Sequence, residues 1–380
     1  MELKNIFPLG LTFDDVLLLP GFSDFSRSEI NLTTKLTRNL EIKIPLVSSP
    51  MDTVTESKLA IALGKLGGIG IIHRNLTITD QVSEVKKTLA EKVKVGAAVG
   101  ASSGFEERVK ALIENGVNAV LVDSAHGFSK NVVSATKFIK KNYPQIEVIA
   151  GSIATADGAK ALIVAGVDGL RVGMGPGAIC TTRIISGMGV PQITALMEVS
   201  EVAKKAKIPV IADGGIKYSG DMVKALAVGA SCVMMGSFFA STIESPGKKI
   251  TLEKQHVPSR FKSILKEDKQ KYVFKEYRGM GSIGAMKEGA KIKSEDEFHG
   301  KNYQDRVLVA EGVEGLVPVK GEVKDLVEQA LGGIKSGMFY VGAKDISELW
   351  EKAKLLQITQ ASLNESHPHD VLITNGGENY

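Results

Sequence analysis

One glycine-rich segment holds the residues best suited to covalent chemistry. It reads GMGPGAICTTRIISGMG at 173–189, with Cys180 near its middle and five glycines around it. A cysteine in a flexible polar loop suits a nucleophile, because a thiolate can attack an electrophilic carbon and form a covalent intermediate. By position alone, an incidental thiol would explain Cys180 equally well. Thr182 and Arg183 follow it and could supply a hydroxyl and a cation to the reacting group.

Two other segments predict a site for a phosphorylated ligand. Asp213-Gly214-Gly215 ends one apolar run, and Gly236-Ser237 ends the next. Glycine lets backbone N–H groups approach an anion closely, so both segments suit a phosphate. The carboxylate of Asp213 is placed to accept two hydroxyl hydrogen bonds from a ribose on that phosphate. The ligand would then be a nucleotide, although an aspartate that caps the next helix fits the local pattern too.

The second cysteine, Cys232, predicts no chemistry. It opens the apolar run SCVMMG, where a cysteine is usually a small buried side chain. Two cysteines also cannot form a disulfide framework or a four-ligand zinc site.

Repeated strand and helix units must position these segments. Amphipathic stretches such as 56–66, 105–115 and 131–141 separate short apolar runs of strand type. The eight runs are IPLVSS at 44–49, GIGII at 68–72, VGAAV at 95–99, AVLVD at 119–123, EVIAGS at 147–152, DGLRVG at 168–173, IPVIAD at 208–213 and CVMMG at 232–236. Continuous apolar strands indicate a parallel sheet covered by helices. Eight units predict an α/β fold of the (β/α)8 TIM barrel type, with the active site at the carboxyl ends of the strands. An open doubly wound sheet is the alternative.

The composition favours a cytoplasmic protein that binds small molecules. The 380 residues hold 47 Lys and Arg against 43 Asp and Glu, a net charge of +4, too near neutrality to hold a nucleic acid or an anionic membrane. No apolar run approaches the length of about 18 residues that a membrane span needs. Basic residues gather at 248–278, which we interpret as a solvated insertion rather than a nucleic-acid patch. The segment 281–310 is expected to be a mobile flap over the barrel mouth.

Long motifs add a resemblance to a known family. They are LTFDDVLLLP at 11–20, IPLVSSPMDTVTE at 44–56, VGMGPGAICTTR at 172–183, GVPQITA at 189–195, IADGGIKYSGD at 211–221, YRGMGS at 277–282 and ESHPHD at 365–370. With these motifs the chain resembles the inosine-5′-monophosphate (IMP) dehydrogenase and guanosine-5′-monophosphate (GMP) reductase family over nearly its whole length. The resemblance implies NAD-dependent oxidation of IMP to xanthosine monophosphate (XMP). Cys180 would attack C2 of the purine, hydride would leave to NAD, and water would hydrolyse the covalent thioimidate.

The resemblance also implies roles for matching residues. Cys180 and Thr182 would be catalytic. The substrate would be bound by Ser49, Met51, Asp213, Gly214, Gly215, Gly236, Ser237, Tyr277, Gly279, Met280, Gly281 and Glu311. The residues beside the nicotinamide of NAD would be Asp123, Ser124, Ser152 and Arg171.

A monovalent cation and a homotetramer are implied in the same way. Potassium (K+) would be held by carbonyls of Gly175, Gly177 and Cys180, together with Glu365, Ser366 and His367 of the partner subunit. One catalytic barrel domain would span 1–380. It would contain the flap at 281–310 and a C-terminal cation-site tail at 355–380.

The chain departs from the family pattern at four places. The regulatory CBS module between the second and third strands is absent. Ala178 replaces a serine of the cysteine loop, and Ser152 replaces an asparagine near the nicotinamide. The Arg-Tyr pair that activates water in the flap is also missing, and Glu297 and Phe298 occupy its positions. Tyr303 and Arg306 are the nearby substitutes.

Two other functions stay open at this stage. A GMP reductase would use Cys180, Thr182 and Glu311 to expel ammonia from GMP and would then take hydride from NADPH, without needing the missing pair. A pseudoenzyme would bind a purine nucleotide without turnover. The motifs IPLVSSPMDTVTE, YRGMGS and ESHPHD favour the dehydrogenase.

Overall fold

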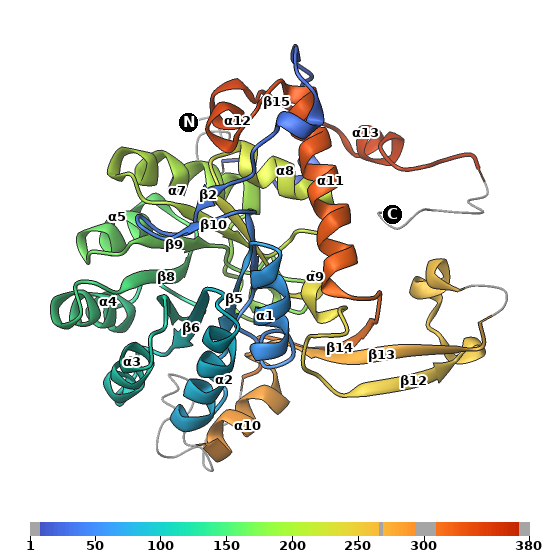
Figure 1. Cartoon of the computed structure of the whole chain (residues 1–380). Coiled ribbons are helices and arrows are strands. Elements are labelled where there is room, and N and C mark those ends of the chain that lie inside the picture. The colour runs from blue at the N-terminus through green and yellow to red at the C-terminus, as the bar shows by residue number, and fades with distance from the viewer. Residues whose placement is uncertain (1–7, 266–268, 293–308, 372–380) are drawn as a thin grey trace.

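The computed structural model describes residues 8–265, 269–292 and 309–371, and its centre is a closed barrel of eight parallel strands (Figure 1). The strands run in the order β10-β11-β4-β5-β6-β7-β8-β9. Their bounds are β4 Leu46–Ser48, β5 Ile69–Ile72, β6 Val95–Val99, β7 Ala119–Asp123, β8 Glu147–Ile153, β9 Gly169–Val172, β10 Val210–Asp213 and β11 Cys232–Met235. The (β/α)8 prediction is therefore confirmed, and the open doubly wound sheet is excluded.

Helices cover the outside of the barrel, as the amphipathic stretches predict. They are α1 Ser57–Lys65, α2 Ile78–Ala90, α3 Phe105–Glu114, α4 Lys130–Asn142, α5 Ala156–Val164, α7 Gln192–Ala206, α8 Ser219–Ala227 and α11 Val323–Val341. Their apolar faces and the outward side chains of the strands form one large buried cluster. Only four residues separate α2 from β6, so this connection leaves no room for an inserted module.

A short hairpin closes the amino-terminal end of the barrel. Its strands are β2 Thr34–Lys35 and β3 Glu41–Ile42. Leu36, Leu40 and Ile42 of the hairpin pack with inward-facing strand residues such as Val47, Ile69, Leu121 and Met234. Because this end is filled by apolar side chains, only the carboxyl end of the barrel can admit a ligand.

A three-stranded antiparallel sheet projects from the barrel beyond β11 (Figure 1). It consists of β12 Lys249–Glu253, β13 Lys271–Arg278 and β14 Glu314–Pro318, and β13 is central. Val257, Tyr272 and Phe274 form its own small apolar cluster. The interpretation of 248–278 as a mere solvated insertion missed this sheet, although every other residue of β12 is exposed.

The remaining elements are small. The strand β1 Val16–Leu18 pairs with β15 Leu355–Gln357, α9 spans Ser237–Ala240, and α6 spans Thr182–Ile185. Helix α10 Ile283–Ile292 begins the predicted flap, whose residues 293–308 lie outside the described part of the chain, as do the predicted catalytic residues Tyr303 and Arg306. Helices α12 Ile346–Lys352 and α13 Gln360–Glu365 follow α11. Among the described residues, no helix is long and apolar enough to span a membrane.

Candidate active site

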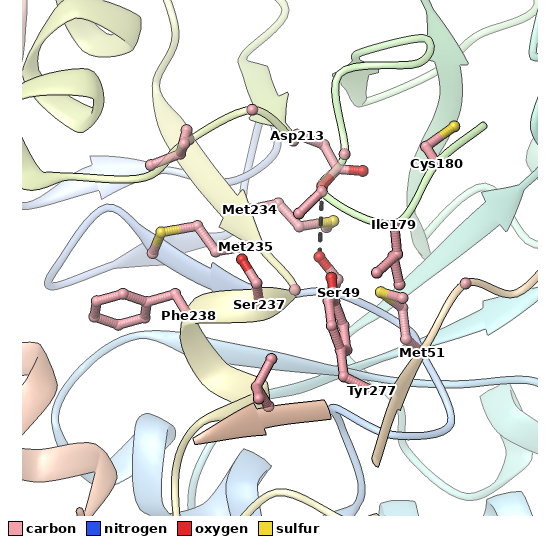
Figure 2. A pocket seen from close by; sticks show the side chains of 18 of the residues that line it. Ser49, Met51, Ile179, Cys180, Asp213, Met234, Met235, Ser237, Phe238 and Tyr277 are labelled. Atoms are coloured by element: carbon pink, nitrogen blue, oxygen red, sulfur yellow. Dashed lines mark hydrogen bonds between the residues drawn. The ribbon is translucent and has the colours of Figure 1, made fainter. Parts of the chain in front are cut away.

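The carboxyl ends of the barrel strands open into one cavity of about 1180 Å³. The described residues with predicted catalytic, substrate or nicotinamide roles all line it, and so do Gly175 and Gly177. Figure 2 draws side chains that line this cavity, and the labelled Cys180 and Asp213 lie on the same pocket as Ser237 and Tyr277. The fold thus brings together residues that are up to 262 positions apart, from Ser49 to Glu311.

A hydrogen-bonded chain leads away from the thiol of Cys180. The Sγ atom donates to Oγ1 of Thr182 at 3.2 Å, and this hydroxyl donates to Oε2 of Glu311 at 2.9 Å. A hydroxyl that accepts from a thiol and donates to a carboxylate can pass a proton between them. Cys180 is only partly buried, whereas Cys232 is fully buried, as predicted for a small apolar side chain.

The backbone around Cys180 is bonded to the segment that follows the flap, and that segment is bonded to the one that precedes it. Cys180 forms a β-bridge with Gly312, and Val313 N donates to Ile179 O at 2.9 Å. The 311–313 segment in turn bonds the YRGMGS segment, because Gly279 N donates to Val313 O at 3.0 Å. The position of the thiol is therefore coupled to the segments that enter and leave the flap.

Arg183 has a different role from the one its position suggested. Its Nη2 atom donates to Val190 O at 2.7 Å, and its side chain packs against Gly175 and Gly189. The expectation that Arg183 supplies a cation to the reacting group is wrong, because this guanidinium holds the two ends of the cysteine loop together.

Arg171 joins the two carboxylates at the barrel mouth. Its Nε and Nη2 atoms each lie 2.7 Å from Oδ2 of Asp213, and its Nη1 donates to Asp123. Although burial opposes the charge, the two carboxylates raise the pKa of Arg171 above its ordinary value. This cation links the predicted ribose site at Asp213 to the predicted nicotinamide site at Asp123, and it holds Asp213 in one orientation.

Asp213 faces the cavity and does not cap a helix. Its Oδ1 atom accepts a hydrogen bond from Ser49 Oγ at 3.4 Å, drawn as the dashed line in Figure 2. The following helix, α8, is capped instead by Asp221, which accepts from Lys217 N at 2.9 Å and Tyr218 N at 3.1 Å. The capping alternative for Asp213 is therefore excluded.

The glycines of the predicted phosphate site have little free space around them. Gly214 and Gly215 adopt φ values of +89° and +80°, and a Cβ on either would touch the ring of Pro176. A Cβ on Gly236 would lie 2.5 Å from the hydroxyl of Tyr277. Burial raises the pKa of Tyr277, so this hydroxyl stays protonated and can donate to an anion.

Four residues around the cavity were not predicted to function there. Arg74 and Asn75 line it directly after β5, and Arg74 Nε lies 3.6 Å from Oδ2 of Asp123. Asn75 Nδ2 lies 2.8 Å from Oδ2 of Asp52, and Arg278 Nη2 lies 2.6 Å from the same oxygen. The rule that found Asp123 and Asp213, namely to inspect residues just after each strand, applies equally to Arg74 and Asn75.

The ion pair between Arg278 and Asp52 should position the YRGMGS segment. Asp52 is nearly buried, and Arg278 directly precedes Gly279. Replacing Arg278 by methionine removes the cation and leaves this carboxylate with the hydrogen bond from Asn75, so we expect kcat/KM for the nucleotide substrate to fall about tenfold or more. The control is Lys291→Met on α10, because Lys291 is exposed and its ion-pair partner in the described part of the chain is Glu288, at 3.2 Å. An equal loss in both variants would show that general surface charge, not this pair, matters.

Within the predicted tail, the three cation-site residues lie at the end of α13 and directly after it: Glu365 is its last residue, followed by Ser366 and His367. Ser366 Oγ donates to Ser362 O at 2.9 Å, and the ring of His367 lies 6.2 Å from that of Tyr218. Glu365, Ser366 and His367 do not line the cavity, so their contact with the cysteine loop of a partner subunit stays a prediction.

Comparisons with known proteins bear on the family of this chain. A family model described as "IMP dehydrogenase / GMP reductase domain" matches residues 10–369. An inosine-5′-monophosphate dehydrogenase of Cryptosporidium parvum is 43% identical over 423 aligned positions that cover all of both chains. One of Borreliella burgdorferi is 42% identical, over 95% of this chain and 97% of its own length.

A longer relative bears on the missing module. The inosine-5′-monophosphate dehydrogenase of Aquifex aeolicus is 38% identical, over all of this chain and 99% of its own length. That alignment has 508 positions, 128 more than the 380 residues of this chain, so the relative carries residues that this chain lacks. From the match to the family model and the extent of these similarities, the chain belongs to the IMP dehydrogenase / GMP reductase family.

Proposed function

We propose that this protein is an IMP dehydrogenase that oxidises IMP to XMP with NAD. The observation that carries the proposal is the arrangement of Cys180, Thr182 and Glu311 in the cavity that also holds Asp213 and the phosphate-site glycines. The similarity to named IMP dehydrogenases over the whole chain supports the same reaction.

Each part of IMP finds matching groups in the cavity. The amides of Gly214, Gly215 and Gly236 and the hydroxyl of Tyr277 suit the phosphate. Asp213, held by Arg171, accepts the ribose hydroxyls. Ala178 lacks the hydroxyl of the usual serine, so the phosphate has one contact fewer from the cysteine loop. The purine then lies toward Cys180, between Met51 and the 279–281 segment.

The chemistry begins at the thiol. The proton of Cys180 passes through Thr182 to Glu311, and the thiolate forms a bond to C2 of the purine while the electron pair of the C2–N3 double bond moves to N3. That pair re-forms the double bond when hydride leaves C2. Bound NAD would accept the hydride that leaves C2. Water then attacks C2 of the remaining thioimidate, the C–S bond breaks, and XMP and the free thiol are formed. Asp123, Ser124, Ser152 and Arg171 line the part of the cavity suited to the nicotinamide.

Hydrolysis of the thioimidate needs a base for the attacking water. We propose that Tyr303 and Arg306 of the flap take the place of the usual pair: the ionised phenol oxygen of Tyr303 accepts the proton of the water, and the positive charge of Arg306 stabilises that ionised form. Glu311 is connected to the thiol through the hydroxyl of Thr182, and its carboxylate is a second base for the same water.

Potassium and a tetramer belong to the same proposal. The carbonyl oxygens of Gly175, Gly177 and Cys180 are hard donors of the kind that alkali cations take, and Gly175 has a φ of +82° that only glycine adopts readily. Glu365, Ser366 and His367 of the partner subunit would complete the site. The flap at 281–310, the tail at 355–380 and a cytoplasmic location are likewise parts of this proposal.

GMP reductase is the second candidate. The hydrogen-bonded chain from Cys180 through Thr182 to Glu311 can also donate a proton to a leaving ammonia, and this reaction has no use for the missing Arg-Tyr pair.

One assay distinguishes the candidates. The protein is mixed with IMP and NAD, or with GMP and NADPH, and the absorbance of the reduced nicotinamide is followed. A rise in the first mixture is expected. A fall in the second mixture with none in the first would instead establish the reductase. No change in either mixture, with IMP binding measured by calorimetry, would leave a nucleotide-binding pseudoenzyme.

A further inference from the structure

A lysine side chain is completely buried beside the phosphate site. Lys275 lies on β13 and is 0% exposed. Its Nζ atom donates to Thr242 O at 2.8 Å, to Ser245 Oγ at 2.6 Å and to Ser245 O. A buried ammonium is costly unless its three N–H groups are satisfied, and here the three acceptors come from a single turn.

That turn is the continuation of α9. The Oγ1 atom of Thr242 donates to Phe239 O at 2.8 Å, and Ser245 Oγ lies 2.9 Å from Ala240 O. Ser245 therefore connects the ammonium of Lys275 to the last carbonyl of α9. Gly236 and Ser237, which carry the proposed phosphate-binding amides, lie at the opposite end of the same short segment.

One strand holds both ends of this segment. Lys275 and Tyr277 are two residues apart on β13, so their side chains point to the same face. The hydroxyl of Tyr277 packs against Gly236 at the start of the segment, and the ammonium of Lys275 donates hydrogen bonds to Thr242 and Ser245 at its end. Lys275 makes no contact with the proposed ligand site itself, since it does not line the cavity.

We infer that Lys275 is a positioning residue, whose ammonium fixes the 236–245 segment against β13 so that the amides of Gly236 and Ser237 stay directed at the substrate phosphate. This inference rests on the proposed function, because it takes that site to bind the phosphate of IMP. It predicts that losing the ammonium weakens binding of the phosphate group of IMP and leaves binding of the nucleoside part unchanged.

The three hydrogen bonds of Lys275 Nζ require its protonated, ammonium form. Burial and, to a smaller extent, the nearby cations Lys249 on β12 and Lys58 on α1 lower the pKa of Lys275 to about 8, while Glu244 acts in the opposite direction. Glu244 itself accepts from Val323 N at 3.0 Å. A neutral amine has two N–H groups, so deprotonation leaves one of the three acceptors without a donor. The segment should loosen as the pH rises from 7 to 9.

The test compares Lys275→Met, which keeps the length of the side chain and removes the donors, with wild type. Calorimetry at pH 7 measures the Kd of IMP and of inosine, which lacks the phosphate. We expect the Kd of IMP to rise about tenfold, that of inosine to change less than about twofold, and kcat at saturating IMP to stay within about threefold. The matched control is Lys249→Met, which removes an exposed cation from the position paired with Lys275 and should bind IMP and inosine at pH 7 as wild type does.

The pH series adds a readout that a merely structural role would not move. From pH 7 to 9 the Kd of IMP should rise more in wild type than in Lys275→Met, because the variant has no group to lose a proton. A proton lost by IMP itself affects both proteins equally and cancels in the comparison.

Several results would overturn the inference. Equal weakening of IMP and inosine, an unchanged Kd of IMP in folded Lys275→Met, or equal pH dependence in the two proteins would each do so. If Lys275→Met does not fold, as judged by circular dichroism, Ser245→Ala serves instead, because it removes one acceptor and the link to Ala240 while keeping the lysine. The same phosphate-specific loss is expected there, and its absence would overturn the inference. If wild type itself fails to bind IMP, the proposed function fails, which is a separate outcome.

Discussion

Replacing Cys180 by alanine should abolish the oxidation of IMP while leaving IMP bound. The thiol is the only proposed nucleophile, so its loss removes the covalent step, and losing a nucleophile lowers kcat by about 10⁴-fold or more. The proposed phosphate and ribose contacts come from Gly214, Gly236 and Asp213, which line the same cavity and are not changed by the substitution. Stopped-flow absorbance measures the reduced nicotinamide, and calorimetry measures the Kd of IMP.

The other cysteine provides the control. Cys232 is fully buried in β11, and burial raises the pKa of its thiol, so it stays uncharged and unreactive. Cys232→Ala should cost about 1 kcal/mol of unfolding free energy and leave kcat nearly unchanged. Turnover by Cys180→Ala at more than a hundredth of the wild-type rate would contradict the covalent mechanism.

Replacing Asp213 by asparagine should have the second largest effect, and it should act on IMP binding. The amide keeps the size of the side chain but loses the charge that pairs with Arg171 and that we propose accepts the ribose hydroxyls. Removing one partner of a buried ion pair costs about 3–5 kcal/mol. If about 3 kcal/mol of this appears in binding, the Kd of IMP rises about 100-fold. Calorimetry with IMP measures it directly.

Asp123→Asn is the matched comparison. Asp123 pairs with the same Arg171 but lies on the side of the cavity proposed for the nicotinamide. We expect Asp123→Asn to raise the KM of NAD and to change the Kd of IMP less than about fivefold. Each variant removes one ion-pair partner of Arg171, so the comparison separates the ribose contact from the release of Arg171. If both variants weakened IMP equally, the effect would come from releasing Arg171 and not from the ribose contact.

The barrel strands could be predicted because their signal is local. The strands β6 and β7 begin and end where the runs at 95–99 and 119–123 do. Both faces of these strands are buried, so nearly every position is apolar, and the run stands out from its polar flanks. The cavity could be located for the same reason, since the residues that follow a barrel strand point to the mouth.

The sheet β12-β13-β14 has no comparable local signal. The strand β13 reads KYVFKEYR, a polar run whose partners are Lys249–Glu253 and Glu314–Pro318. Its stability comes from pairing between distant segments, which no short window of the chain contains. The burial of Lys275 was unpredictable for this reason, because an isolated lysine in such a run is normally exposed.

The amino-acid sequence alone determined the barrel, the family and the residues that line the cavity, because strand periodicity and long motifs are local properties. The tertiary structure alone decided the partners of those residues: Arg171 between Asp123 and Asp213, Thr182 between Cys180 and Glu311, and Lys275 beneath α9. It also gave Arg183 a structural role where its position had suggested a chemical one. Hydrogen bonds and ion pairs act over a few ångströms, and only the folded chain brings such distant side chains within that range.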